Sequence, residues 1–116
     1  MISLILNQEG HEVLTADTVE KAFALITSEN ISLCILDGKL PDGNGTDLCR
    51  KIKAFNKNIS VIFYSAAARA TDLEAAREAG ADDYLIKPLG WDKLVETVNK
   101  RLKPNLQNLI NNQLAA

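Results

Sequence analysis

The chain has 116 residues, of which 47% are hydrophobic and 24% are charged, and this is sufficient for one globular domain with its own core. Its net charge of −2 at pH 7 provides no basic surface, so we expect no direct contact with nucleic acid or with an anionic membrane. No apolar run approaches the length of about 18 residues that a membrane-spanning helix needs.

Short apolar runs alternate with amphipathic helical patterns along the sequence. The run Ile31–Asp37 is almost continuously apolar, which is typical of a strand that is covered on both faces. Thr71 and Glu74 have the spacing of a capping box, and Gly80 marks a left-handed helix end. In chain order, the pattern predicts a strand over 11–16, a helix that starts at Val19 after an N-cap at Asp17 or Thr18, a strand over 31–37, a helix over 46–55, a strand over 59–65, a helix over 71–79, a strand over 83–87 and a helix over 91–102.

This alternation of strands and helices with short connections predicts an α/β fold with a parallel, doubly wound sheet. Three polar residues, Asp37, Ser65 and Lys87, each come at the carboxyl end of a predicted strand. They are separated by 28 and 22 residues, which is about one strand–helix–strand unit each. We therefore expect a carboxylate, a hydroxyl and an ammonium group to meet at one edge of the sheet.

These three side chains suit phosphoryl transfer. A carboxylate can act as the nucleophile towards a phosphoryl group, and the ammonium and hydroxyl groups can neutralise and bind phosphoryl oxygens. Hard oxygen ligands of this kind favour Mg²⁺ as the accompanying cation. Asp82 and Asp83 lie where a loop leads into the predicted strand 83–87, so they should lie at the opposite edge, and Lys53 is expected to face solvent.

Four motifs carry a family resemblance: Ile35–Asp37 with Leu40–Gly43, Ser65 with Ala66, Ala79–Tyr84, and Lys87 with Pro88. With them, residues 1–103 resemble the receiver domain of two-component response regulators. The resemblance implies a flavodoxin-like fold in which Asp37 accepts a phosphoryl group from a sensor histidine kinase or a phosphotransfer protein. It implies that Lys87 contacts the phosphoryl group, that Ser65 and Tyr84 form a switch pair, and that Asp37 and the backbone carbonyl of Lys39 hold Mg²⁺. The Tyr84 ring is expected on the sheet face opposite Asp83 and Leu85, over the groove between the last two helices.

The start of the chain departs from this family pattern. Receivers begin with a strand that ends in two adjacent acidic residues, whereas Met1–Gly10 resembles the last turns of the first receiver helix, just before its turn at Gly10 into the next strand. Three explanations remain: upstream residues are missing, Met1–Leu6 rearranges to fill the gap in the sheet, or a second chain fills it. We favour missing upstream sequence. Without the upstream acidic pair, we expect Mg²⁺ to bind weakly to this chain.

The predicted function is that of a phosphoacceptor receiver domain, not an enzyme, over residues 1–103, followed by a tail over 104–116 whose role stays open. An output domain or a second copy is expected to bind through the surface of the predicted helix 71–79, strand 83–87 and helix 91–102, called the 71–102 face below. One alternative is a pseudo-receiver, an interaction module with impaired binding of Mg²⁺ and phosphate. A phosphatase of the haloacid dehalogenase type is disfavoured, because it needs Asp where this chain has Lys39. The two cysteines lack zinc-site spacing and suit reduced thiols in the cytoplasm.

Overall fold

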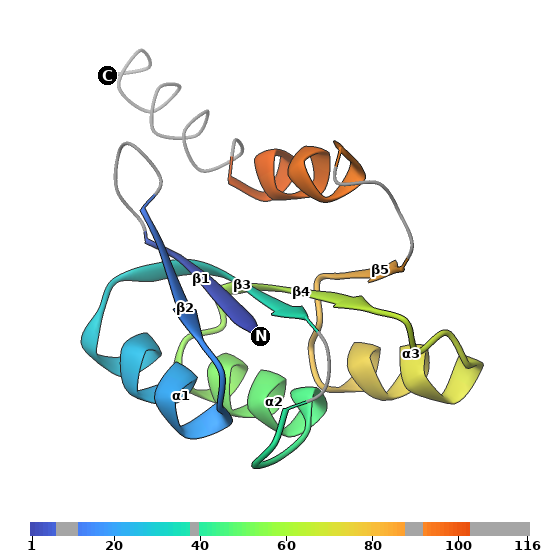
Figure 1. Ribbon diagram of the computed structural model, residues 1–116, viewed down its shortest axis with the longest axis horizontal. Coiled ribbons are helices and arrows are strands. Elements are labelled where there is room, and N and C mark those ends of the chain that lie inside the picture. The colour runs from blue at the N-terminus through green and yellow to red at the C-terminus, as the bar shows by residue number, and fades with distance from the viewer. Residues whose placement is uncertain (7–11, 38–39, 88–91, 103–116) are drawn as a thin grey trace.

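Five strands form one sheet in the order β2-β1-β3-β4-β5 within the part of the chain that this computed structural model describes, residues 1–6, 12–37, 40–87 and 92–102 (Figure 1). The strands are β1 (Ile2–Leu6), β2 (Val13–Ala16), β3 (Ile31–Asp37), β4 (Ser60–Ser65) and β5 (Asp83–Ile86). The helices are α1 (Val19–Ser28), α2 (Gly45–Phe55) and α3 (Ala70–Glu78), and residues 92–102 are also helical. The alternation predicted from residue 13 onwards is confirmed.

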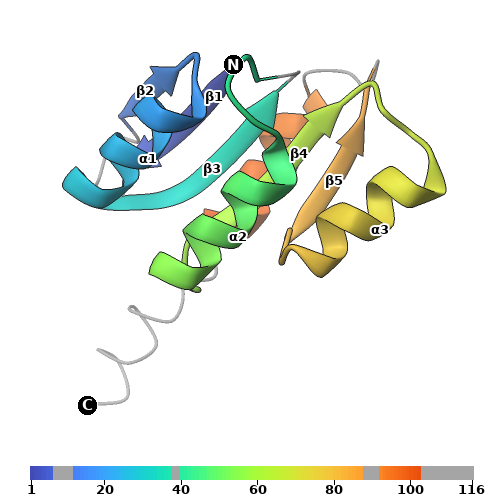
Figure 2. The same cartoon turned by 90° about the horizontal axis from the view of Figure 1, so that it is seen from below.

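Helices cover both faces of the sheet. Figures 1 and 2 show α1, α2 and α3 on one face and the helix 92–102 on the other. In β3, Cys34 and Leu36 belong to the core beneath α1–α3, whereas Leu33 and Ile35 belong to the core beneath the helix 92–102. Successive side chains of a strand point to opposite faces, and here both faces are buried. This two-sided burial explains why the sequence of β3 is almost continuously apolar.

The first strand corrects the prediction for the start of the chain. Met1–Gly10 was expected to resemble the end of a helix, but Ile2–Leu6 is a strand that lies between β2 and β3, antiparallel to both; residues 7–10 lie outside the described parts of the chain. Ile2 pairs with Leu36, and Leu6 lies near Ile31 at the other end of β3. A parallel arrangement of β1 and β2 would need a crossover of about a dozen residues or more, whereas only six residues separate Leu6 from Val13. In this structure Ile2–Leu6 fills the place between β2 and β3: the other four strands share one direction and β1 is reversed.

The limits of α3 also differ from the prediction. The helix begins at Ala70, and the Asp72 carboxylate accepts a hydrogen bond of 3.2 Å from the backbone N–H of Arg69. Thr71 lies inside the first turn, so the capping box predicted for Thr71 and Glu74 is wrong. Asp72 is the third helical residue, and its carboxylate makes the bond to the N-cap backbone N–H that was predicted for Glu74. The predicted left-handed helix end is confirmed, because Gly80 has φ of 101°.

The amino edge of the parallel strands is held together by ion pairs. Lys53 of α2, which was expected in solvent, is half-buried and donates from Nζ to Asp82 at 2.8 Å and to the Ile59 carbonyl at 2.7 Å. The same Asp82 carboxylate accepts from the backbone N–H of Val61 at 2.7 Å. Asp82 is thus a structural residue at the edge opposite Asp37, as the sequence predicts.

Candidate functional site

The carboxyl ends of β3, β4 and β5 lie side by side. The parallel register pairs Asp37 with Tyr64 and Ser65 with Ile86, so the backbones of Asp37, Ser65 and Lys87 come to the same edge of the sheet. The backbone N–H of Lys87 donates to the Ser65 carbonyl at 2.9 Å, which continues the pairing of β4 and β5 beyond the last strand residue. The convergence of these three strand ends is therefore confirmed, whereas the carboxylate of Asp37 and all of Lys39 lie outside the described parts of the chain.

Ser65 and Lys87 differ in their surroundings. The Ser65 hydroxyl accepts a hydrogen bond of 3.1 Å from the backbone N–H of Ala67, which closes a tight turn at the end of β4. The Nζ of Lys87 lies 5.2 Å from the centroid of the Tyr64 ring, a distance suited to a cation–π interaction. Both side chains are half-buried at the edge of the sheet. The strand ends thus bring a residue with a hydroxyl group and a residue with a cation to this edge.

Tyr84 lies on the face of the sheet that α1–α3 cover. Its ring stacks on Phe63 with centroids 5.5 Å apart and planes inclined by 4°, and its hydroxyl donates to the Ala67 carbonyl at 2.6 Å. The prediction that Tyr84 and Leu85 point to opposite faces is confirmed, because Leu85 belongs to the core beneath the helix 92–102. The groove was wrongly predicted: the ring lines a pocket between α2 and α3 rather than the groove between the last two helices.

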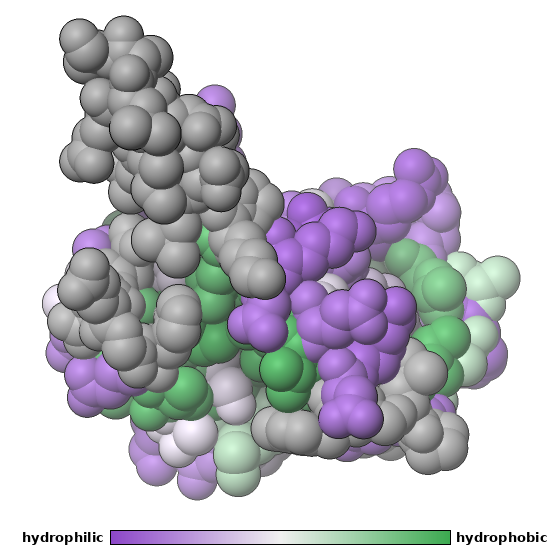
Figure 3. Space-filling model, turned by 90° about the horizontal axis from the view of Figure 1, so that it is seen from above, coloured by the Kyte–Doolittle hydropathy of each residue, from purple (hydrophilic) through white to green (hydrophobic). Residues whose placement is uncertain are grey.

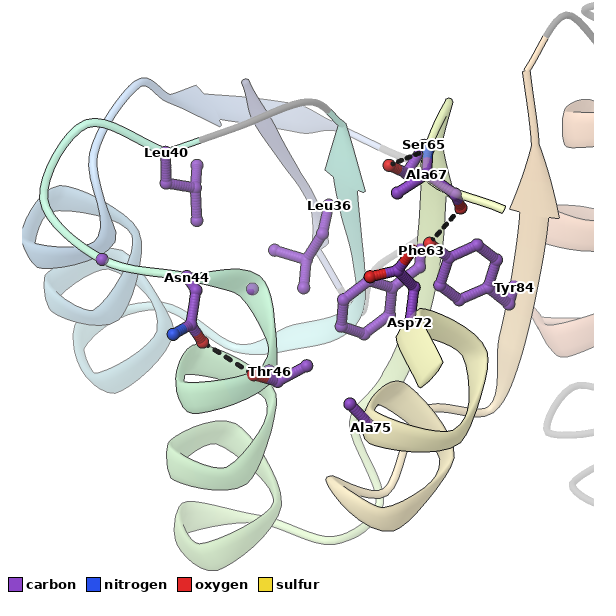
Figure 4. A pocket seen from close by; sticks show the side chains of 12 residues that line it. Leu36, Leu40, Asn44, Thr46, Phe63, Ser65, Ala67, Asp72, Ala75 and Tyr84 are labelled. Atoms are coloured by element: carbon purple, nitrogen blue, oxygen red, sulfur yellow. Dashed lines mark hydrogen bonds between the residues drawn. The ribbon is translucent and has the colours of Figure 1, made fainter. Parts of the chain in front are cut away.

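This pocket, of about 470 Å³, opens beside the carboxyl ends of β3 and β4 (Figure 4). Its floor includes Leu36, Phe63 and Tyr84, and Asn44 at the start of α2 and Asp72 of α3 stand on opposite walls. The side chain of Asn44 caps α2 by accepting from the backbone N–H of Asp47 at 2.8 Å. The pocket is next to the predicted site, and Ser65 and Tyr84 line both.

A carboxylate that the sequence did not identify as a cap fixes the loop after β3. The two oxygens of Asp42 accept from the backbone N–H groups of Val19 at 2.7 Å and Glu20 at 3.1 Å, at the amino end of α1. These hydrogen bonds, that of Val19 above all, lower the pKa of the Asp42 carboxyl group. Asp42 therefore ties the loop between β3 and α2 to the start of α1. The Pro-Asp-Gly sequence indicated a turn, but not this distant partner.

The carboxyl edge offers few ligands for a metal ion. Among the described residues, no group of three His, Cys, Asp or Glu side chains could hold a metal. The strand next to β3 brings Ile2 to the level of Leu36, where a receiver of the expected pattern has its acidic pair. Mg²⁺ in proteins usually binds through one or two carboxylates and keeps several waters. The described neighbours of Asp37 therefore fit a tightly held Mg²⁺ poorly, and the weak binding expected from the sequence stays a prediction.

Comparison with known proteins identifies the family. A family model described as the response regulator receiver domain matches residues 1–99. A probable transcriptional regulatory protein of Picosynechococcus sp. is 37% identical over 102 residues, which cover 82% of this chain and 41% of that protein. The DNA-binding response regulator MtrA of Mycobacterium tuberculosis is 30% identical over 105 residues, which cover 90% of this chain and 46% of that protein. This chain thus spans less than half the length of these curated relatives.

Solved structures agree with this result. The CheY-like receiver domain protein of Methanospirillum hungatei superposes with a TM-score of 0.78 at 31% identity, covering 86% of this chain and 80% of that one. The receiver domain of a putative Luxo repressor protein from Vibrio parahaemolyticus gives a TM-score of 0.77 at 31% identity, covering 88% and 79%. The flavodoxin-like fold is therefore confirmed, and the chain belongs to the response regulator receiver domain family.

Proposed function

We propose that this chain is a phosphoacceptor receiver domain in which Asp37 takes a phosphoryl group from the phosphohistidine of a sensor histidine kinase or a phosphotransfer protein. The observation that carries the proposal is the register of β3, β4 and β5, which brings the backbones of Asp37, Ser65 and Lys87 to one edge. Asp37 is the nucleophile, the Ser65 hydroxyl donates to a phosphoryl oxygen, and Lys87 balances the negative charge.

The family sets what is expected around this reaction. Receiver domains are generally signalling domains rather than classical enzymes, and they generally bind Mg²⁺ at the phosphorylation site. In this chain we propose that Asp37 and the backbone carbonyl of Lys39 would hold the ion, which when bound neutralises phosphoryl oxygens. Only one of these two ligands carries charge, so the proposed binding is weak.

Ala67 suggests how phosphorylation would reach Tyr84. The backbone N–H of Ala67 donates to the Ser65 hydroxyl, and the Ala67 carbonyl accepts from the Tyr84 hydroxyl. If Ser65 turns towards a phosphoryl group, it loses its bond to Ala67, and the turn that holds the Tyr84 hydroxyl loses one of its restraints. Ser65 and Tyr84 are therefore proposed as the switch pair, linked through one backbone unit. Phosphorylation of Asp37 would shift the equilibrium between the two conformations of this switch. The covalent structure would change only at Asp37.

The test of the phosphoacceptor compares two variants in which a different aspartate is replaced by asparagine. Asp37→Asn should abolish labelling by acetyl phosphate or by a cognate kinase. Asp47→Asn, in an exposed carboxylate of α2 that pairs with Arg50 at 3.1 Å, should leave labelling unchanged. Full labelling of Asp37→Asn would refute the assignment. Loss of labelling in both variants would point to damage to the fold rather than to the acceptor.

A pseudo-receiver is the second candidate, and the reversed β1 favours it, because this strand brings Ile2 rather than acidic residues to the carboxyl edge. Such a module would present the 71–102 face to partners without phosphorylation. A pseudo-receiver would bind its partner with the same affinity in the native chain and in the Asp37→Asn variant. A phosphoacceptor receiver would lose the phosphorylation-dependent part of that binding.

The partners follow from the family in outline. Response regulators interact with histidine kinases and often carry DNA-binding output domains. We propose residues 1–103 as the receiver unit, with an output domain or a second copy binding through the 71–102 face and without direct contact to nucleic acid or membrane. In the described residues, no helix is both long and apolar enough to cross a membrane. Two free buried cysteines support a reducing compartment, and we propose the cytoplasm.

A further inference from the structure

The proposed phosphoryl transfer leaves the pocket between α2 and α3 unused. Its volume of about 470 Å³ lies within the range of about 300–1,000 Å³ that is typical of small-molecule sites (Figure 4). The pocket is on the face of the sheet that α1–α3 cover. Figure 3 views the opposite side, where the apolar surface of the described residues is interrupted by polar side chains. The pocket is thus the better candidate for a small-molecule site.

The floor of the pocket is aromatic and aliphatic. Leu36 and Phe63 are buried, and the Phe63 ring stacks on that of Tyr84 with planes inclined by 4°. Gly45 lets α2 approach this floor closely, because a Cβ atom at position 45 would lie only 2.9 Å from Cε2 of Phe63. A flat hydrophobic ring in a ligand would match such a floor, since aromatic rings pack in offset stacks or edge to face.

One wall of the pocket carries a carboxylate with an unused oxygen. Oδ2 of Asp72 accepts from the backbone N–H and from Nε of Arg69, each at 3.2 Å, whereas Oδ1 accepts no hydrogen bond from the residues that the structure describes. Figure 4 shows the Asp72 side chain directed into the pocket. The Arg69 side chain is 84% exposed, so water screens its charge. Among the described residues that line the pocket, Asp72 alone is charged, and this favours a cationic ligand.

Most of the other polar side chains at the pocket are already engaged. Oδ1 of Asn44 accepts from the Thr46 hydroxyl at 2.7 Å and from the backbone N–H of Asp47 at 2.8 Å. The Tyr84 hydroxyl donates to the Ala67 carbonyl at 2.6 Å. The unused carboxylate oxygen is therefore the strongest acceptor left, and a positively charged N–H group is the donor that gains most from it.

We propose that this pocket binds a small molecule that combines a flat aromatic ring with a positively charged nitrogen group, such as an aryl amidine. The ring packs on Leu36 and Phe63, and the cationic N–H group donates to Oδ1 of Asp72. An aryl carboxylate of the same size is rejected, because it would place a like charge beside Asp72. Binding does not require a phosphoryl group on Asp37, so its test is independent of the proposed function.

Titration of the full chain with three probes of nearly one shape tests the charge selectivity. Benzamidine is cationic, benzamide is neutral and benzoate is anionic. Benzamidine should shift the backbone amide NMR signals of Gly45, Thr46 and Ala75, which line the pocket, and should bind about tenfold more tightly than benzamide. Benzoate should leave these signals unchanged.

Two carboxylates of α3 provide matched variants. Asp72→Asn should remove most of the preference for benzamidine over benzamide, while its amide oxygen can still accept from the backbone N–H of Arg69. Glu74→Gln should leave the preference unchanged, because this exposed carboxylate pairs with Arg77 at 2.6 Å and does not line the pocket. Ala75→Leu, which places a larger side chain in the pocket, should weaken binding of both probes.

Several results would overturn the proposal. One is the absence of benzamidine binding to the native chain at millimolar concentrations, and another is binding of benzoate as tight as that of benzamidine. Equal effects of Asp72→Asn and Glu74→Gln would show that the cation responds to the overall charge of α3 rather than to the pocket. Signal changes confined to residues away from the pocket would place the probe elsewhere.

Discussion

At the scale of single residues, Asp82 is the polar residue on which the amino edge depends most. Its carboxylate binds both the Lys53 ammonium and the backbone N–H of Val61. Asp82→Ala would take the carboxylate partner away from the half-buried Lys53 ammonium and leave the Val61 N–H without this acceptor, which should cost about 1–3 kcal/mol of unfolding free energy. Urea denaturation measures this loss. Asp47→Ala, which breaks the exposed pair with Arg50, should cost only about 0–1 kcal/mol. Equal losses in the two variants would contradict the structural role of Asp82.

Asp42 makes a prediction about pH. Its folded-state pKa lies below the ordinary value of 3.8, so the carboxylate is preferred in the folded protein. A carboxyl group with a lowered pKa contributes stability that is present above its unfolded-state pKa and is lost as the pH falls through the folded-state pKa. The native chain should therefore be more stable than Asp42→Asn at pH 6, and this difference should shrink below about pH 4. Denaturation at a series of pH values measures it, and a difference that grows towards acid would contradict the cap.

The sequence could not have identified either role in full. The partners of Asp42 are 22 and 23 residues away, and those of Asp82 are 21 and 29 residues away. Side chains at such separations meet only through the packing of elements, which local spacing does not encode. The same holds for Tyr84: alternation along β5 correctly predicted its face, but the predicted groove would need α3 and the helix 92–102 on one face of the sheet, whereas they lie on opposite faces.

At the scale of elements, the sequence was most informative where an element is long or buried on both sides. Strand β3 is predicted correctly because the parallel sheet buries both of its faces, and Gly80 marks the end of α3 because its φ of 101° favours glycine. Strand β1 was misassigned because a short apolar run fits a strand and a helix equally well. Its direction depends on the six residues that connect it to β2, not on its own composition.

The place of β1 in the core can be tested directly. Leu4 is fully buried between β2 and β3, so Leu4→Ala should lower the unfolding free energy by about 2–5 kcal/mol. Ser3→Ala, at the neighbouring position on the opposite face of the sheet, should change it by about 0.5 kcal/mol or less. Chemical denaturation of the two variants compares them. If Leu4→Ala is as mild as Ser3→Ala, β1 is not the strand that fills the sheet.

At the scale of the whole molecule, the reversed β1 sets how well the site works. Mg²⁺ binding should fall in the millimolar range, because the described neighbours of Asp37 add no carboxylate. Without the ion, one unit-charge repulsion at ~4 Å and an effective dielectric constant of ~20 costs about 4 kcal/mol. If this repulsion energy is added to the activation free energy, phosphoryl transfer slows roughly a thousandfold, at about 1.36 kcal/mol per factor of ten. Calorimetric titration and labelling kinetics, with a receiver that has the acidic pair as the control, measure both effects. Tight binding and a normal rate would show that acidic groups from elsewhere complete the site.

The most direct test of the phosphoacceptor is to locate the phosphoryl group itself. The chain is incubated with acetyl phosphate for long enough to allow slow transfer, the acyl phosphate is reduced with borohydride, and the peptides are mapped by mass spectrometry. The structure brings Asp37 to the edge that Ser65 and Lys87 share, so the reduced residue should be found at position 37 and be absent from Asp37→Asn. A reduced residue at another aspartate, with position 37 intact, would contradict the proposed function.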